Sequence, residues 1–367
     1  MTYLNDLKSV VEINSYTKNK PGVDRVGELF DKWFKELGFH VEVHERELIG
    51  SHRHYTSKYS KNTKRLLLLG HLDTVFPPEK FEIYHEDTEW VYGPGVCDMK
   101  GGNIVALQAL REIKNQNIEI QNIDILLVSD EETGSDDSKF LTSKIAKNYD
   151  YCFVYEAAGV ELEVVTGRKG VGTFFIDIEG KAAHAGNCYS DGHDANLEAS
   201  YKLQELVKLT DLSKGTTVNV GKIEGGIGAN TISPHAQLTF EIRYKVTQER
   251  DRVLSAIEAI VQHSYVNGTT SKLRGAIQRD VMQTSERSLE LVERIQKITN
   301  TALKYEERGG VSDANTMSSC GVVTLDGFGP YGDGDHTLKE RANKESFKSR
   351  IELSRALFAY FIEKSDF

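Results

Sequence analysis

The chain has 367 residues, 39% of them hydrophobic, and a formal net charge of −10 at pH 7. This length is typical of two domains, or of one domain with a large insertion. The negative charge argues against nucleic acid and anionic membranes as partners, because both attract basic surfaces. Four scattered cysteines without a C-x-x-C pair favour reduced thiols. With no signal-peptide pattern and no apolar run of membrane-spanning length, we expect a soluble cytoplasmic protein.

The first part of the chain alternates helix-like and strand-like patterns. Apolar residues at helical spacing predict helices over 24–37 and 102–114, with Gly38 as a stop for the first. Alternation predicts a strand over 39–45. Continuous apolar runs predict strands buried on both faces; these runs cover 65–70, 123–128 and 151–155. Strands that alternate with helices indicate an α/β domain with a mostly parallel sheet.

The pattern changes near residue 170. The expected order becomes strand, helix, two strands, helix and strand, over 172–180, 194–209, 216–224, 236–244, 248–262 and 270–277. This β-α-β-β-α-β order is the split arrangement of a ferredoxin-like domain. Helix and strand patterns resume afterwards, at 288–303 and 321–325. The sequence therefore predicts an α/β domain in two pieces, residues 1–169 and 279–367, with an α+β domain inserted at 170–278.

Polar residues follow the buried strands. Open α/β sheets bind ligands at the carboxyl ends of their strands, so these residues are candidates for a binding site. They are His71 after 65–70, Glu131 and Glu132 after 123–128, Glu156 after 151–155, Asp98 in the loop YGPGVCDMKGG, and His336 after 321–325. Two histidines and several carboxylates at one sheet edge suit zinc, or a related divalent metal such as cobalt or manganese.

Each of these residues also has an ordinary explanation when it is taken alone. A histidine after a strand is usually a solvated loop residue, Asp98 and Glu156 could cap a helix, and SDEETGS could be a solvated acidic turn. Five ligand candidates in five separate glycine-containing contexts favour a metal site as the joint explanation. The remaining histidines are expected at the surface; among them are His52, His54, His85 and His263.

Together these motifs resemble a known family. GHLDTV, GPGVCDMKGG, SDEETGS, EAAG and the late DHT are similar to the motifs of the co-catalytic zinc exopeptidases, in the same order over nearly the whole chain. That family includes glutamate carboxypeptidase, the aminoacylases, acetylornithine deacetylase and succinyl-diaminopimelate desuccinylase, and the resemblance is closest to the glutamate carboxypeptidase branch. The inserted domain stands where the family has its lid and dimerisation domain.

The resemblance implies roles for the residues at the strand ends. His71 and Glu156 would bind one zinc ion, Glu132 and His336 a second, and Asp98 would bridge the two. Asp73, two residues after His71, would hold that imidazole in one tautomer. Glu131 would be the general acid/base, taking a proton from the attacking water and giving it to the leaving amine. The resemblance also implies a cis peptide bond between Asp98 and Met99.

The inserted domain would add contacts to substrate. His184 in KAAHAG stands where the family has a histidine that reaches a dimer partner's active site and stabilises the oxyanion. Asn230 in GGIGANTI is at the family's substrate-binding asparagine. Arg243 and Arg274, on the strands of the inserted domain, could grip a substrate carboxylate with two parallel hydrogen bonds. His184 could instead be a histidine of a surface loop, and Arg274 could instead be a solvated arginine on a strand.

The expected activity is hydrolysis of an amide bond by two zinc ions per chain. A carboxypeptidase releasing a C-terminal residue, for example glutamate, from a small peptide or N-acyl amino acid is the leading hypothesis. An N-acyl amino-acid deacylase and an aminopeptidase or dipeptidase remain alternatives, because they share the same metal centre. A metal-binding scaffold without activity is a third, against which the full ligand set and Glu131 count. A homodimer through the inserted domain is implied by the resemblance.

Overall fold

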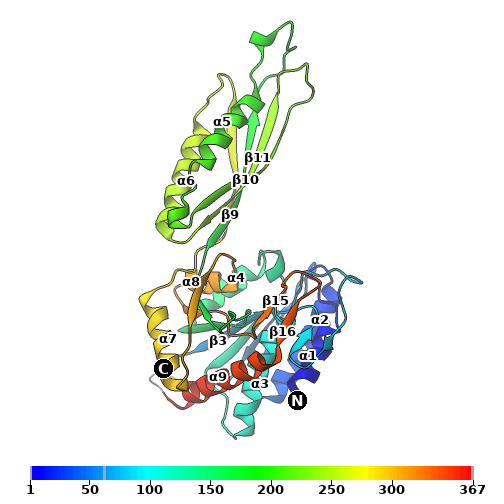
Figure 1. Ribbon diagram of the computed structural model, residues 1–367, viewed down its shortest axis with the longest axis vertical. Helices are drawn as coiled ribbons and strands as arrows, with labels where there is room; N and C mark the ends of the chain where they lie inside the picture. Colours follow the sequence, from blue (N-terminus) through cyan, green and yellow to red (C-terminus); the bar gives the residue numbers. More distant parts are fainter. Residues whose placement is uncertain (1, 61–62, 365–367) are drawn as a thin grey trace. The chain divides into compact units, whose positions relative to one another are not determined.

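The computed structural model describes residues 2–60 and 63–364. The chain forms two compact units, each of which is described by itself (Figure 1). Unit 1 comprises Met1–Gly167, Thr284–Arg308 and Ser312–Phe367, and unit 2 comprises Arg168–Gln283 and Gly309–Val311. Unit 2 is therefore inserted into unit 1. The sequence predicts the two main junctions after residues 169 and 278.

The central sheet of unit 1 carries its strands in the order β1-β2-β6-β3-β7-β14. The strands are His40–His44 (β1), His52–Thr56 (β2), Leu66–His71 (β3), Ile123–Val128 (β6), Tyr151–Val154 (β7) and Val323–Leu325 (β14). Strands β6, β3, β7 and β14 pair in parallel, whereas β2 pairs antiparallel with both β6 and β1. All residues of β3 and β6 are buried, which confirms the prediction drawn from their continuous apolar runs.

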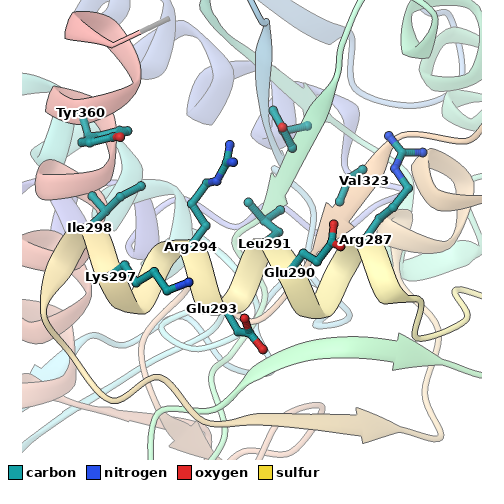
Figure 2. A pocket seen from close by; sticks show the side chains of 10 residues that line it. Arg287, Glu290, Leu291, Glu293, Arg294, Lys297, Ile298, Val323 and Tyr360 are labelled. Atoms are coloured by element: carbon teal, nitrogen blue, oxygen red, sulfur yellow. The ribbon is translucent and has the colours of Figure 1, made fainter. Parts of the chain in front are cut away.

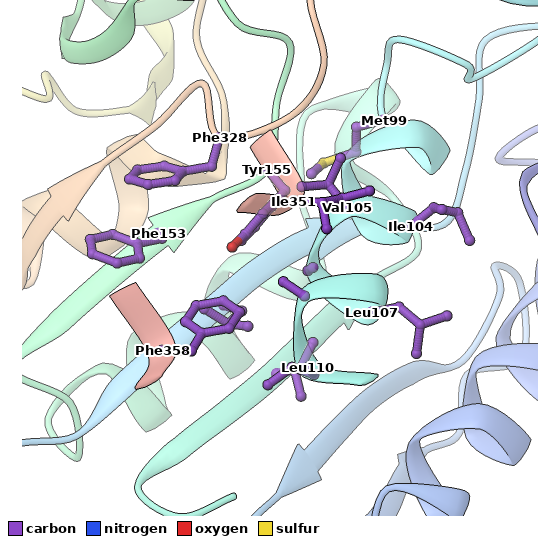
Figure 3. Packing of buried hydrophobic residues seen from close by; sticks show 14 of the residues in the cluster. Met99, Ile104, Val105, Leu107, Leu110, Phe153, Tyr155, Phe328, Ile351 and Phe358 are labelled. Atoms are coloured by element: carbon purple, nitrogen blue, oxygen red, sulfur yellow. The ribbon is translucent and has the colours of Figure 1, made fainter. Parts of the chain in front are cut away.

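Helices of unit 1 build its core on this sheet. They are Thr2–Val11 (α1), Lys20–Glu36 (α2), Lys100–Asn115 (α3), Ser138–Ala146 (α4), Glu286–Thr299 (α7), Asp313–Ser319 (α8) and Lys344–Glu363 (α9). Helix α3 packs against α1 and α9. Leu107 and Leu110 of α3, Phe358 of α9 and Phe153 of β7 all belong to one buried cluster (Figure 3). The core therefore fixes α3 against the sheet.

Glycine lets α3 begin close to the end of β7. A Cβ atom placed on Gly102, in the first turn of α3, would come within 1.8 Å of the backbone oxygen of Tyr155. No flexible side chain could move aside there, because the obstacle is backbone. The absence of a side chain at Gly102 therefore allows the Asp98 loop, which leads into α3, to lie beside Glu156.

Short strands bring two loops of unit 1 together. They are His85–Glu86 (β4), Trp90–Tyr92 (β5), Gly332–Asp333 (β15) and Arg341–Asn343 (β16), in the order β15-β16-β5-β4. Because β16 pairs with both β5 and β15, the loop that carries His336 lies near the loop that carries Asp98. A separate two-stranded sheet joins Val164–Arg168 (β8) to Tyr305–Arg308 (β13).

Unit 2 has the predicted β-α-β-β-α-β order. Its elements are Gly170–Glu179 (β9), Ala195–Val207 (α5), Thr217–Gly225 (β10), His235–Tyr244 (β11), Thr247–Gln262 (α6) and Thr270–Arg279 (β12). The sheet order is β10-β11-β9-β12, with every pair antiparallel. Helices α5 and α6 lie along one face of the sheet (Figure 1) and share an apolar core with it. The prediction of a ferredoxin-like domain is confirmed.

The segments that enter and leave unit 2 run side by side. Arg168 N donates to Met282 O at 2.8 Å, and Met282 N donates to Arg168 O at 3.1 Å. Within unit 1, the hydroxyl oxygens of Thr166 and Thr284 are 3.2 Å apart. Within each unit, the segment before the junction and the segment after it are therefore direct neighbours.

Some expectations from the sequence are wrong in detail. The helix expected at 288–303 ends at Thr299, because Asn300 adopts a left-handed conformation with φ 49°. His52 and His54, expected at the surface, are buried with 0% and 8% exposure, because β2 lies inside the sheet between β1 and β6. No helix among residues 2–60 and 63–364 is long and apolar enough to cross a bilayer.

Candidate metal centre

Residues from distant parts of unit 1 meet at the carboxyl edge of its parallel strands. His71 is the last residue of β3, and the others follow strands or precede α3: Asp98 before α3, Glu132 in the 3-10 turn Glu131–Thr133 after β6, Glu156 after β7, and His336 between β15 and β16. Because β6, β3 and β7 are parallel neighbours, their carboxyl ends share one edge. Ligand atoms of His71, Asp98 and Glu132 all lie within 4.8 Å of one another.

Asp98 stands between the two histidines. One of its oxygens, Oδ1, is 3.0 Å from His71 Nε2, and the other, Oδ2, is 3.2 Å from His336 Nε2. Glu156 Oε1 lies 3.7 Å from His71 Nε2, and Glu132 Oε2 lies 3.1 Å from His336 Nε2. The geometry gives two donor groups that share Asp98, the arrangement expected of a bridged pair of metal ions.

The electrostatics of the centre favour a bound cation. Burial and the charge of Asp98 raise the pKa of Glu132 to about 8 and the pKa of Glu156 well above its usual range. Hydrogen bonds to Asp98 and Glu132 raise the pKa of His336 to about 11. Buried carboxylates crowded in this way need nearby positive charge. Metal ions supply that charge when they bind carboxylates and neutral imidazoles, so these residues fit a divalent metal centre.

Asp73 connects His71 to the glutamate pair. Its backbone oxygen is 3.0 Å and its Oδ1 3.4 Å from His71 Nδ1, so the proton on Nδ1 faces Asp73 and Nε2 faces Asp98. The same carboxylate accepts the backbone N–H groups of Glu131 and Glu132, both at 3.3 Å, and the hydroxyl of Thr17 at 2.6 Å. One buried aspartate therefore orients both sides of the centre.

Glu131 and Glu132 occupy different surroundings despite their adjacency. The side chain of Glu132 is 4% exposed and contacts His336. Glu131 is half-buried, and its charge is felt by the carboxyl of Glu156. The turn thus brings the Glu132 carboxylate to His336, whereas the charge of Glu131 contributes to the raised pKa of Glu156.

A residue that sequence reasoning missed holds the Asp98 loop. Glu340 is 1% exposed and accepts the backbone N–H groups of Gly95 and Cys97 at 3.0 Å and of Asp98 at 3.1 Å. Burial raises the pKa of Glu340 to about 8, although these N–H donors favour its charged form. Glu340 stands four residues after His336, so it ties the two loops together. The expected cis peptide bond between Asp98 and Met99 is present.

Two of the predicted substrate contacts lie together within unit 2. His184 forms a bridge with Thr231, and Ala185 N donates to Asn230 O at 2.9 Å. His184 Nδ1 accepts the backbone N–H groups of Gly186 and Asn187 at 3.2 and 3.1 Å. The ring proton of the neutral histidine is therefore on Nε2, which makes the exposed His184 a hydrogen-bond donor.

The two predicted arginines already have partners within unit 2. Arg243 pairs with Glu241 through two hydrogen bonds of 2.6 and 3.2 Å and donates to Gly309 O. Arg274 holds Asp177 through Nε and through Nη2, the latter at 3.0 Å, and stacks over the Phe175 ring. Either arginine would have to exchange a carboxylate partner before it gripped a substrate.

One cavity of unit 1 lies away from the metal centre. It has a volume of about 660 Å³ and runs along α7, where Figure 2 shows Arg287 beside Val323 and Arg294 further along the helix, past Leu291. Val323 and Tyr151 begin β14 and β7, so this cavity lies at the amino edge of the parallel strands. None of the predicted site residues lines it.

Comparison with known proteins agrees with the geometry. Residues 166–269 match the family model described as a peptidase dimerisation domain, and residues 53–205 match peptidase family M28. The chain is 28% identical to carboxypeptidase G2 of Pseudomonas sp. over 91% of this chain and 82% of that protein. Together these matches support the M20 peptidases, which are dinuclear zinc exopeptidases, as the family of this chain. The family resemblance drawn from the motifs is thereby confirmed, and the protein is a metal-dependent hydrolase.

Other M20 relatives carry different activities in their names. An acetylornithine deacetylase of Vibrio parahaemolyticus is 29% identical over 66% of this chain and 68% of its own. A tripeptidase of Staphylococcus aureus shares the fold with a TM-score of 0.81 at 21% identity, covering 99% of this chain and 98% of its own. Carboxypeptidase, deacetylase and peptidase names thus all occur among the similar proteins.

Proposed function

We propose that this M20 protein is a di-zinc carboxypeptidase that releases a C-terminal amino acid from a small peptide or N-acyl amino acid. The observation that carries the proposal is the pair of donor groups sharing Asp98, and Glu131 is the neighbour of Glu132 in the turn after β6. The similarity to carboxypeptidase G2 over most of both chains favours this substrate class. Glutamate as the released residue, a cytoplasmic location and a homodimer through unit 2 stay predictions.

The proposed ligands divide between two ions. His71 and Glu156 would hold one, Glu132 and His336 the other, and Asp98 both. Bound there, the ions would supply Lewis-acid polarisation of the scissile carbonyl and charge for the developing oxyanion. Zinc is the best match to this mixed histidine and carboxylate donor set, with cobalt and manganese as alternatives.

The chain's own residues would complete the reaction. Glu131 would take a proton from the attacking water and deliver it to the leaving amine, because it adjoins the proposed ligand Glu132 in the turn and is not itself one of the proposed ligands. As the resemblance implies, the Nε2–H group of His184 would donate to the oxyanion in the active site of a dimer partner, and Asn230, its neighbour within unit 2, would bind substrate. Asp73 would keep His71 in the tautomer that presents Nε2.

A deacylase or an aminopeptidase is the second candidate, and the deacetylase and tripeptidase among the similar proteins favour it. A panel of N-acyl amino acids, dipeptides and tripeptides separates the candidates when it is assayed with zinc-, cobalt- and manganese-loaded protein. A preference for free C-terminal carboxylates supports the carboxypeptidase. Turnover that requires a free amino terminus, or only small acyl groups, overturns it. Recovery of fewer than two divalent ions per chain after saturation would contradict the bridged centre.

Arg274→Ala is expected to raise KM for substrates with a free carboxylate by about tenfold or more, because a hydrogen-bonded charge pair contributes about 1.5–3 kcal/mol. Steady-state kinetics on such a substrate and on its C-terminal amide measure the effect, and KM for the amide should not change. Lys272→Ala is the matched control, since Lys272 is an exposed cation two residues away on the same face of β12. An unchanged KM for the carboxylate substrate would remove Arg274 from the site.

A further inference from the structure

A second group of metal-binding side chains lies in unit 1, on the antiparallel pair β1–β2. Glu42 and His44 are on β1, and His54 on β2 is directly opposite Glu42. Side chains two residues apart, and those of opposed residues, share one face of a sheet. One ligand atom of each residue lies within 4.8 Å of the other two, and His44 Nε2 is 3.8 Å from Glu42 Oε1.

This group is separate from the M20 metal centre. In the sheet order, β2 and β6 stand between β1 and β3, the strand that ends in His71. At the usual spacing of neighbouring strands, β1 and β3 are about 14 Å apart. Glu42, His44 and His54 therefore cannot contribute to the ions proposed at His71 and His336.

The hydrogen bonds around His54 leave one of its ring nitrogens unprotonated, as metal binding requires. Its Nε2 is 2.8 Å from the hydroxyl oxygen of Tyr149, and that hydroxyl donates its proton to Asp124 at 2.8 Å. The hydroxyl must then accept the Nε2–H group, which leaves Nδ1 without a proton. A histidine that donates its other ring N–H to a fixed acceptor is the usual arrangement around a protein-bound metal ion.

His44 has a nitrogen whose polarity nothing in the described residues satisfies. Its Nε2 atom is buried and makes no hydrogen bond, an arrangement that destabilises the folded state unless a ligand compensates. Burial also lowers the pKa of His44 and of His54, so both favour the neutral form that binds metals.

Charged groups around the three residues partly compensate one another. Glu42 contributes the negative charge of the group. Arg46, Lys144 and Arg65 are the nearby cations that disfavour charge on the histidines. Arg46 is paired with Asp137 and Arg65 with Asp124, which leaves Lys144 as the principal charge opposing a metal ion.

We propose that Glu42, His44 and His54 bind a zinc ion that clips β1 to β2. Two imidazoles and one carboxylate form a three-ligand set with a fourth position for water. Donor atoms around tetrahedral zinc lie about 3.3 Å apart, so small side-chain rotations close the group. Because the metal joins two strands, its binding stabilises the folded unit.

Zinc stoichiometry tests this site directly. In excess free zinc, the wild-type chain is expected to retain one more zinc equivalent after dialysis than the double variant His44→Ala/His54→Ala. Glu42→Gln, whose side chain is largely exposed, should also lose that equivalent with little risk to folding. His85→Ala, which removes an exposed histidine on β4, is the matched control and should bind as much zinc as the wild type. Equal zinc in all the variants overturns the site.

Tyr149→Phe provides a second test, because it removes only the hydroxyl that receives the His54 proton. It is expected to weaken zinc binding at this site by about tenfold or more, the usual effect of losing a partner of a metal-bound histidine. Excess zinc should also raise the melting temperature of the wild type more than that of His44→Ala/His54→Ala. Unchanged affinity in Tyr149→Phe, or equal zinc-dependent shifts, would contradict the proposal. Both readouts are independent of amide hydrolysis.

Discussion

Replacing Glu131 with glutamine is expected to lower kcat by about 10²–10⁴-fold, the usual contribution of a positioned acid–base group. Glutamine keeps the shape of the side chain but cannot accept and return a proton at neutral pH. Both metal ions should remain bound, because Glu131 is not one of the proposed ligands. Single-turnover hydrolysis together with metal analysis of the same sample measures both properties.

Glu132→Gln is the matched comparison, since it makes the same chemical change one residue away. Glu132 contacts His336 and is nearly buried, so its loss should release one metal ion and raise the zinc concentration needed for activity. The proposed division of labour requires the two variants to differ. If both lose metal, or if Glu131→Gln keeps wild-type kcat, Glu131 is not the proton carrier.

Glu340→Gln is expected to weaken zinc binding at the centre by about 10–100-fold, the range found when a residue that orients a ligand is changed. The carboxylate accepts three backbone N–H groups of the Asp98 loop, and an amide nitrogen in place of one oxygen cannot accept. Asp98 then loses the loop geometry that places it between His71 and His336. Zinc titration of hydrolysis measures the apparent affinity.

Recovery of activity at high zinc separates positioning from general destabilisation. A loop that holds Asp98 less firmly should regain most of kcat when zinc is raised, whereas a damaged fold should not. Glu345→Gln, at an exposed glutamate at the start of α9, is the control and should behave as the wild type. Wild-type zinc affinity in Glu340→Gln would show that the contact has no influence on the centre.

Much of the fold follows from local patterns in the sequence. The buried strands β3 and β6 are continuous apolar runs, and such runs are stable only between covering layers. Unit 2 alternates apolar and polar residues along β9 and β11, which matches one covered face. Four of the proposed ligands could be located because they come after strands of the unit 1 sheet, and parallel strands bring their carboxyl ends to one edge. Asp98 could be located from its glycine-rich loop before α3.

Other features depend on contacts that no local pattern records. Strand β2 reads HRHYT, without an apolar run, and it is buried only because β1 and β6 flank it. This is why His52 and His54 were expected at the surface. Glu340 is one acidic residue in a polar loop, and its role depends on a loop 243 residues away along the chain. The sequence does contain a signal for helix α9, because Phe347, Ile351 and Phe358 are spaced so that they lie on one helical face.

The paired segments at the junction of the two units make this protein suited to domain grafting. Arg168 and Met282 are hydrogen-bonded neighbours within unit 2, and Thr166 and Thr284 are neighbours within unit 1. A tight turn from Gly167 to Thr284 can therefore replace the insertion without stretching the remaining chain, apart from the short return at Gly309–Val311. The same two positions are therefore where the corresponding unit of another M20 protein could be joined, because each unit keeps its paired chain ends when the other is exchanged.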